Sequence, residues 1–207
     1  MSLLEENSGV KMDYENDPSR SPPESGLSCA HSGSQVNAHT QVNPGAPQQF
    51  SIEDQDHKVL ILHCENLMAV PNKNGVHAEI FFVLASHLSS ASEEKGGPIL
   101  LAVSKGERCL YCKKNKRQRK PTLVLKKKKL TKLATQSEKA RQPFIFYKAR
   151  VGSRYTLESA AYPGWFVCTS YNAHELVDMT EFGKRKYMEF DFIRISELPI
   201  SPNEVSD

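Results

Sequence analysis

Short apolar segments separated by turn residues fill the chain from Phe50 onward, and this pattern limits the fold more than any other feature. The clearest segment is YMEFDFIRI (187–195), where Phe190 and Phe192 flank an acidic residue, as in a strand with one buried face. Further strands are predicted at 58–62, 67–70, 78–86, 98–104, 108–112, 122–126, 143–150, 154–160, 165–170 and 174–179. About a dozen strands with little helix predict an all-β barrel or sandwich, and periodicity alone does not choose between the two.

Helical spacing occurs only in residues 130–142. Leu130, Leu133 and Ala134 would share one face of a helix, and Pro143 would end it. We expect either one short helix or a loop at this position.

The first 49 residues have a different composition from the rest. Ser, Pro, Gly, Asn and Gln account for 25 of them, and Tyr14 is the only aromatic residue. Such a segment buries too little apolar surface to offset the loss of chain entropy. We therefore expect residues 1–49 to be a disordered, propeptide-like segment and residues 50–207 to form one domain.

Targeting signals are not evident in the sequence. The opening MSLLEENSGVKMDYEND lacks the basic and apolar regions of a signal peptide. No stretch approaches the roughly 18 apolar residues of a membrane span, so we expect no membrane insertion. The five cysteines are odd in number and unevenly spaced, which predicts free thiols and a precursor made in the cytoplasm.

Basic residues are concentrated in 105–132, which holds 13 Lys or Arg against the single acidic residue Glu107. The runs KKNKRQRK (113–120) and KKKK (126–129) lie at either end of a predicted strand, so the first would be a hairpin loop. The two runs would lie near each other, at the two ends of the hairpin or along its edge. The candidate patch consists of Lys113, Lys114, Lys116, Arg117, Arg119, Lys120, Lys126, Lys127, Lys128 and Lys129.

Three interpretations of this patch stay open. A solvated loop that keeps an edge strand soluble needs no partner. Contact with heparan sulfate or nucleic acid would be salt-dependent and non-specific. Lys/Arg-rich octamers also resemble nuclear-import signals. Sequence-specific DNA reading is not expected, because no recognition helix is present and Tyr111 is the only aromatic nearby.

A metal site is suggested by the order His77-Ala78-Glu79 followed by Cys109 and Cys112, which imitates a zinc-deaminase motif. Both segments are predicted strands, and Cys109 and Cys112 would point to opposite faces, one buried and one exposed, which does not suit a shared tetrahedral ion. No nucleophile elbow, phosphate loop or recognisable carboxylate pair occurs either. We therefore expect no metal, no cofactor and no enzymatic activity.

The segment LESAAYPGWFVCTSYNAHELV (157–177) resembles the signature of the interleukin-1 family. Leu157 departs from the signature at its first position and Val167 departs mildly, whereas the matching positions are Ser159, Ala160, Pro163, Phe166, Cys168 and Thr169. The resemblance extends over about residues 50–207, through segments such as FSIEDQDHKVLIL and RQPFIFYKA. It implies a β-trefoil of twelve strands, in which a six-stranded barrel is capped by three hairpins. The signature residues would then serve packing and turn formation, and they would identify the fold without marking a binding surface.

The same resemblance implies a cytokine that acts by binding. The likeness is to an anti-inflammatory member, which implies suppression of innate immune responses through immunoglobulin-domain receptors. The implied partners are the interleukin-18 receptor alpha chain, an inhibitory single-immunoglobulin co-receptor, a Smad transcription factor in the nucleus and a second copy of the chain. Secretion to the extracellular space without a signal peptide is also implied. The alternatives are a heparin-binding or polyanion-binding trefoil growth factor and a pro-inflammatory family member.

Family members without a signal peptide are commonly trimmed after Asp by caspase-type proteases, and the resemblance implies such processing here. The Asp residues before position 50 are Asp13 and Asp17. Pro18 follows Asp17, which disfavours cleavage there, so Asp13 is the better candidate.

Overall fold

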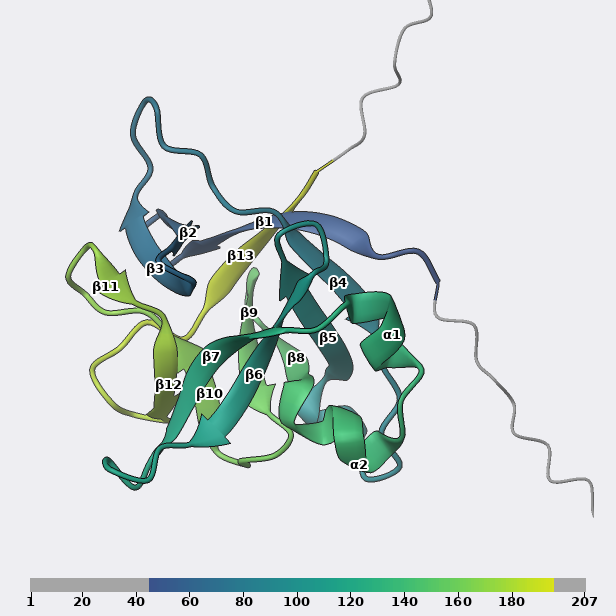
Figure 1. Cartoon of the computed structure of the whole chain (residues 1–207). Helices are drawn as coiled ribbons and strands as arrows, with labels where there is room; N and C mark the ends of the chain where they lie inside the picture. Colours follow the sequence, from purple (N-terminus) through teal and green to yellow (C-terminus); the bar gives the residue numbers. More distant parts are fainter. Residues whose placement is uncertain (1–44, 196–207) are drawn as a thin grey trace, which may run out of the picture. The chain divides into compact units, whose positions relative to one another are not determined.

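The structure is a computed structural model that describes residues 45–195 (Figure 1). The predicted cleavage positions Asp13 and Asp17 lie outside the described residues. The strands are β1 (Gln48–Asp54), β2 (Lys58–His63), β3 (Asn66–Pro71), β4 (Phe81–Ala85), β5 (Gly97–Val103), β6 (Arg108–Lys114), β7 (Pro121–Lys127), β8 (Ile145–Val151), β9 (Arg154–Ser159), β10 (Trp165–Cys168), β11 (Glu175–Leu176), β12 (Asp178–Glu181) and β13 (Phe190–Arg194). The helical elements are η1 (Glu93–Lys95), α1 (Leu130–Ala134), α2 (Glu138–Arg141) and η2 (Gln142–Phe144).

Six strands close into a barrel. In the order β1, β4, β5, β8, β9 and β13, each pairs antiparallel with the next, and β13 pairs with β1 to complete the ring. Three further antiparallel pairs, β2–β3, β6–β7 and β10–β12, complete three units of four strands. This arrangement confirms the predicted all-β class and the β-trefoil barrel with its three hairpins.

Two details of the strand prediction need correction. β1 is absent from the predicted strands, although Phe50 and Ile52 alternate with polar residues in it. The predicted strand 174–179 is two short strands, because β11 pairs with β3 while β12 pairs with β10. β11 is therefore an addition to the twelve strands of the trefoil.

The inside of the barrel shows the same threefold pattern in its side chains. The bulkiest fully buried residues are Phe81, Phe146 and Phe190, which come from the last strand of each four-strand unit. Each such burial contributes roughly 1.5–3 kcal/mol to folding. The apolar positions of the strands therefore converge on one central core.

A second core lies where α1 and η2 cover one face of β5 and β6. Leu130, Leu133 and Phe144 pack there against Cys109, which is 0% exposed. Cys112, on the same strand, is 1% exposed in the barrel core. The predicted exposed thiol is thus wrong, because α1 and η2 cover the Cys109 face of β6 and the barrel core encloses the Cys112 face.

The helical prediction for 130–142 is partly correct. Two short helices form instead of one, because Ser137 adopts φ −58° and ψ 152°, which is not helical. Pro143 lies within η2 and does not end the segment. No helix in residues 45–195 is long and apolar enough to cross a membrane.

Candidate functional site

The signature segment first builds the turn between β9 and β10. Ser159 ends β9, and its Oγ accepts a hydrogen bond of 3.2 Å from the backbone N–H of Tyr162. Glu158 Oε1 accepts one of 2.8 Å from Gly164 N–H, and Gly164 has φ +80°, which a residue with a Cβ adopts only with strain. Pro163 is exposed in this turn. This geometry agrees with the expectation that residues of the signature serve turn formation.

The rest of the signature lies on or beside β10. Ala160 is buried just after β9, and its N–H donates to Ile145 O at 3.0 Å. Phe166 and Cys168 belong to β10, opposite Thr180 and Asp178 of β12. These contacts are all within the fold, which supports the interpretation that the signature serves structure.

Thr169 closes the signature and contacts a buried ion pair. Its hydroxyl donates to Asp54 Oδ2, and Asp54 also accepts hydrogen bonds from the backbone N–H of Asp56 and of Lys58. Lys58 Nζ lies 3.0 Å from the same carboxylate, and the side chains of Lys58 and Asp54 are 3% and 0% exposed. The Lys58 ammonium also lies 4.7 Å from the centre of the Tyr187 ring. This cluster joins the end of β10 to the β1–β2 turn.

The two basic runs lie at opposite ends of the β6–β7 hairpin. The register pairs Lys114 with Pro121 at one end and Arg108 with Lys127 at the other. Six residues of strand separate these pairs, or about 20 Å at a rise of ~3.3 Å per residue. The register agrees with the predicted placement at the two ends of the hairpin, but the two runs are not near each other, so the candidate patch divides into two groups.

Lysines of the second run have partners within the protein. Lys126 Nζ lies 4.9 Å from the centre of the Tyr111 ring, and Lys128 Nζ donates to Gln136 Oε1 at 2.7 Å. Lys127 lies 3.7 Å from a Glu65 carboxylate oxygen. Lys129 forms a similar pair at 3.5 Å with Glu107. The carboxylates of Glu65 and Glu107 offset the charge of Lys127 and Lys129, whereas Lys126 and Lys128 keep their charge and are positioned by an aromatic ring and an amide.

The first run is mostly unpaired. Lys120 Nζ donates to Asp178 Oδ2 at 2.7 Å. The other five cations are exposed and form no ion pair with any residue in 45–195. We name this group the basic finger: Lys113, Lys114, Lys116, Arg117 and Arg119.

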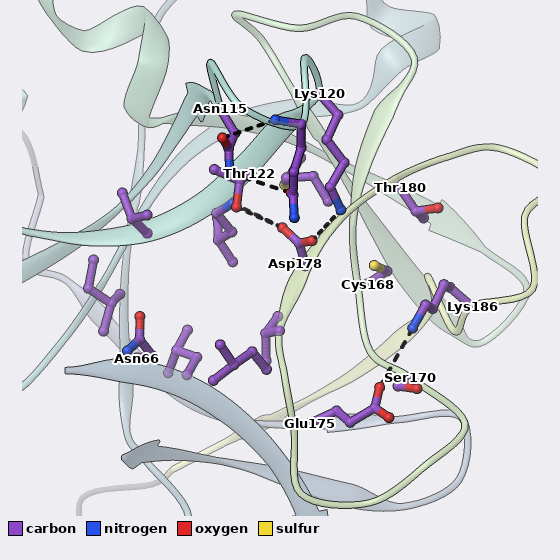
Figure 2. A pocket seen from close by; sticks show the side chains of 18 residues that line it. Asn66, Asn115, Lys120, Thr122, Cys168, Ser170, Glu175, Asp178, Thr180 and Lys186 are labelled. Carbon is purple, nitrogen blue, oxygen red and sulfur yellow. Dashed lines mark hydrogen bonds and ion pairs between the residues drawn. The ribbon is translucent and has the colours of Figure 1, made fainter. Parts of the chain in front are cut away.

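Beside the basic finger lies a cleft of about 520 Å³, shown in Figure 2. It is bounded by β7, by β11 and β12, and by the start of β3. Its apolar lining consists of Leu67, Leu123, Val124, Leu125, Leu176, Val177 and Met179. Polar side chains, among them Asn66, Asn115 and Thr122, surround this lining. The cleft takes residues from all three hairpins, which have no motif in common, so the sequence does not predict it.

Asp178 joins two sides of the cleft. It accepts hydrogen bonds from Lys120 Nζ, from Thr122 Oγ1 at 2.9 Å and from the backbone N–H of Leu123 at 3.4 Å (Figure 2). Burial is the largest single influence and raises the pKa of Asp178, but the hydrogen bonds from Lys120, Met179 N–H and Thr122 together outweigh it and lower the pKa below 3.8. The carboxylate is therefore ionised at neutral pH and holds β7 against β12.

Glu175 and Lys186 form a second pair at the cleft, 3.8 Å apart (Figure 2). Hydrogen bonds from Ser170 and Asn172 lower the pKa of Glu175. Cys168 lines the cleft but is no nucleophile at neutral pH, since burial raises the pKa of its thiol to about 11. The cleft therefore combines an apolar lining with two ion pairs, an arrangement that suits the binding of a ligand.

Metal coordination is not supported by the described part of the chain, where no cluster of three His, Cys, Asp or Glu could hold an ion. Cys64, Cys109, Cys112 and Cys168 are all free thiols.

Comparison with known proteins identifies the family. A family model described as Interleukin-1 / 18 matches residues 71–193. The chain belongs to the interleukin-1 family. It is 55% identical to human Interleukin-37 over an alignment of 219 positions that covers 100% of both chains. It is 36% identical to human Interleukin-36 alpha, over 70% of this chain and 90% of that protein.

Solved structures agree with the interleukin-1 family fold. The NMR structure of the pro-inflammatory cytokine interleukin-36alpha matches with a TM-score of 0.59 and 32% identity, over 72% of this chain and 94% of that one. The crystal structure of chicken interleukin 1 beta matches with a TM-score of 0.60 over 73% and 98%, and at 20% identity it shows the fold alone. The chain is therefore an interleukin-1 family cytokine, a class that binds receptors and is not enzymatic.

Proposed function

We propose that this cytokine suppresses innate immune responses by binding the interleukin-18 receptor alpha chain together with an inhibitory single-immunoglobulin co-receptor. The observation that carries the proposal is the 55% identity to human Interleukin-37 over the full length of both chains. A rigid barrel that presents loops suits such recognition, because loops on a fixed scaffold supply binding residues at little cost in entropy. The action is extracellular, after release from the cytoplasm.

Surface plasmon resonance tests the receptor assignment. The full chain is passed over the immobilised alpha-chain ectodomain, with and without the soluble co-receptor ectodomain. We expect saturable binding that dissociates more slowly when the co-receptor is present, because a ternary complex buries more surface. An unrelated immunoglobulin-domain ectodomain is the control. Equal retention on all surfaces would contradict the proposal.

A pro-inflammatory activity is the second candidate. It is favoured by the 36% identity to human Interleukin-36 alpha and by the fold shared with that pro-inflammatory cytokine. Macrophages stimulated with lipopolysaccharide distinguish the two, since the chain should lower the release of inflammatory cytokines under the first proposal and raise it under the second.

A role in binding polyanions is supported by the basic finger, whose five cations are exposed and unpaired among the described residues. We propose that these residues contact heparan sulfate outside the cell and assist nuclear import inside it. Partnership with a Smad transcription factor and formation of a homodimer are proposed from the family likeness alone. Sedimentation velocity at several protein concentrations tests the dimer.

A propeptide is proposed for residues 1–49, with the cytokine domain in 50–207. The composition of the first segment supports this division, but the boundary moves by two residues, because Gln48 and Gln49 belong to β1 and pair with β4. Processing after Asp13 or Asp17 is the corresponding proposal for maturation. The mass of the secreted chain tests it directly.

A further inference from the structure

Strand β7 has an open edge. It pairs with β6 on one side, and no strand in residues 45–195 pairs with its other side. In antiparallel pairs, positions that exchange hydrogen bonds alternate with positions that do not. The bond from Asn115 N–H to Lys120 O, and that from Lys128 N–H to Glu107 O, fix this alternation at the two ends of the hairpin.

The alternation decides which backbone groups face outward. Thr122 and Val124 exchange hydrogen bonds with β6, so Leu123 and Leu125 direct their N–H and C=O groups away from it. The contact of Leu123 N–H with Asp178 agrees, because that carboxylate lies on the far side of β7 from β6. The N–H of Leu125 and the carbonyls of both leucines therefore remain available at the cleft.

The cleft beside this edge suits an extended segment. Its volume of about 520 Å³ lies within the range of roughly 300–1,000 Å³ that ligand sites occupy. The side chains of Leu67, Leu125 and Leu176 give it an apolar lining. Backbone groups along one wall and apolar surface along another are the two requirements for adding a strand to a sheet edge.

Charge indicates what kind of segment fits. The basic finger begins at one end of β7, and its cations have no anionic partners among the described residues. Lys120 and Lys186, inside the cleft, are already neutralised by Asp178 and Glu175. The centre of an occupant should therefore be uncharged and its end acidic. A second copy of β7 is disfavoured, because it would bring a second basic finger to the same surface.

We propose that the open edge of β7 binds an extended acidic peptide of a partner protein as an added strand. The peptide backbone bonds to Leu125 N–H and to the carbonyls of Leu123 and Leu125. Its apolar side chains enter the cleft, and its acidic residues contact the basic finger. This site goes beyond receptor recognition and does not depend on which receptor the cytokine uses.

Peptide titration with two probes tests the geometry. The first probe is a fluorescein-labelled octapeptide, Glu-Asp-Val-Thr-Val-Thr-Asp-Glu, and binding is followed by fluorescence anisotropy of the full chain. Two N-methylated versions of this probe each block alternate backbone amides. Since only one set of amides faces β7 in an added strand, one version should bind at least about tenfold more weakly while the other binds like the parent. Equal binding of both versions overturns the proposal.

Hydrogen exchange by NMR locates the bound peptide. The Leu125 amide should exchange rapidly in the free chain and be protected at saturating probe, whereas the Val124 amide, which bonds to β6, should change little. Binding without protection of Leu125 would indicate non-specific polyanion contact and would overturn strand addition. Absence of binding at millimolar probe would also overturn it.

Charge variants complete the test. Lys116→Glu with Arg117→Glu should weaken binding by about tenfold or more at low salt, because both cations lie at the acidic end of the probe. Lys132→Glu with Lys139→Glu makes the same change in net charge on exposed positions of α1 and α2. This control pair should bind the probe like the parent chain. An equal loss in both pairs would show an effect of net charge and would contradict the proposed site.

Discussion

Thr169 Oγ1 donates a hydrogen bond of 2.6 Å to Asp54 Oδ2, although 115 residues separate the two in sequence. Both side chains are buried, and Asp54 also pairs with Lys58. A buried carboxylate is tolerated only when its oxygens are hydrogen-bonded or paired. Thr169, the last residue of the signature, thus donates a hydrogen bond to a buried carboxylate in the first four-strand unit. This bond connects the third unit to the first strand of the barrel.

Replacing Thr169 by Val should destabilise the fold. The substitution keeps the shape of the side chain but removes a donor to a buried carboxylate, so we expect a loss of about 2 kcal/mol in the free energy of unfolding. Urea denaturation followed by Trp165 fluorescence measures this loss. Thr156→Val is the control, because Thr156 is half-buried on β9. A shift no larger than that of the control would mean that the bond contributes little.

Much of the fold could be predicted from the sequence because most strands of the barrel have local signals. Phe190 and Phe192 alternate with acidic residues in β13, and the segment from Ser159 to Thr169 resembles the signature of the interleukin-1 family. β1 carries the same alternating signal in Phe50 and Ile52, which is sufficient to predict a strand there.

The rest depends on tertiary packing. The sequence predicts that one of Cys109 and Cys112 is exposed, but both are buried, because α1 and η2 cover Cys109 and the barrel core encloses Cys112. The cleft could not be predicted, since Leu67, Leu123 and Val177 come from hairpins far apart in sequence. The two basic runs lie less close together than the sequence suggests, because the hairpin register places them at opposite ends of β7.

Thiol reactivity should separate Cys64 from the other described cysteines. Cys64 is exposed. Burial raises the pKa of Cys109 to about 12 and the pKa of Cys112 to about 11, so both stay protonated and unreactive at pH 8. We expect iodoacetamide to alkylate Cys64 within minutes and to reach Cys109 and Cys112 only after unfolding. Peptide mass spectrometry with and without urea measures the order, and alkylation of Cys112 in the native chain would contradict it.

The free energy of unfolding should depend on pH in the acid range, in part through Asp178. Its folded pKa is lower than its ordinary value of 3.8, so its ion pair with Lys120 stabilises the fold above that pH and is lost as the pH falls through the folded value. Asp178→Asn should therefore be less stable than the parent at pH 7, and the difference should shrink near pH ~3. Urea midpoints at both pH values measure it, with Glu93→Gln, an exposed change in η1, as the control. If the parent and Asp178→Asn differed in stability by the same amount at both pH values, the ionisation of Asp178 would not be coupled to folding.

Limited proteolysis should remove the N-terminal segment and stop near the barrel. β1 pairs with both β13 and β4, so cleavage within it requires opening of the barrel, whereas the composition of 1–49 offers few apolar groups for packing. We expect subtilisin at low ratio to leave a stable fragment that begins at or before about residue 48. Intact-mass analysis identifies the first cut. A first cut between residues 58 and 195 would contradict the proposed division of the chain.

Heparin affinity should depend on the basic finger more than on the second run. Changing four residues of the basic finger, Lys114, Lys116, Arg117 and Arg119, to Gln removes four exposed cations that have no ionic partner in the described chain.

The matched variant changes Lys126, Lys127, Lys128 and Lys129, whose ammonium groups already contact aromatic rings, an amide or carboxylates. Each unpaired side-chain cation that contacts a polyanion displaces a bound counterion and strengthens binding. The finger variant should therefore elute from heparin at clearly lower salt than the matched variant.

Receptor binding measured on the same two variants decides whether the basic finger serves receptor recognition or polyanion binding. A variant that loses heparin retention but keeps its affinity for the alpha-chain ectodomain is a receptor ligand with an accessory polyanion site. Loss of all activity with the finger would instead make polyanion binding the main function.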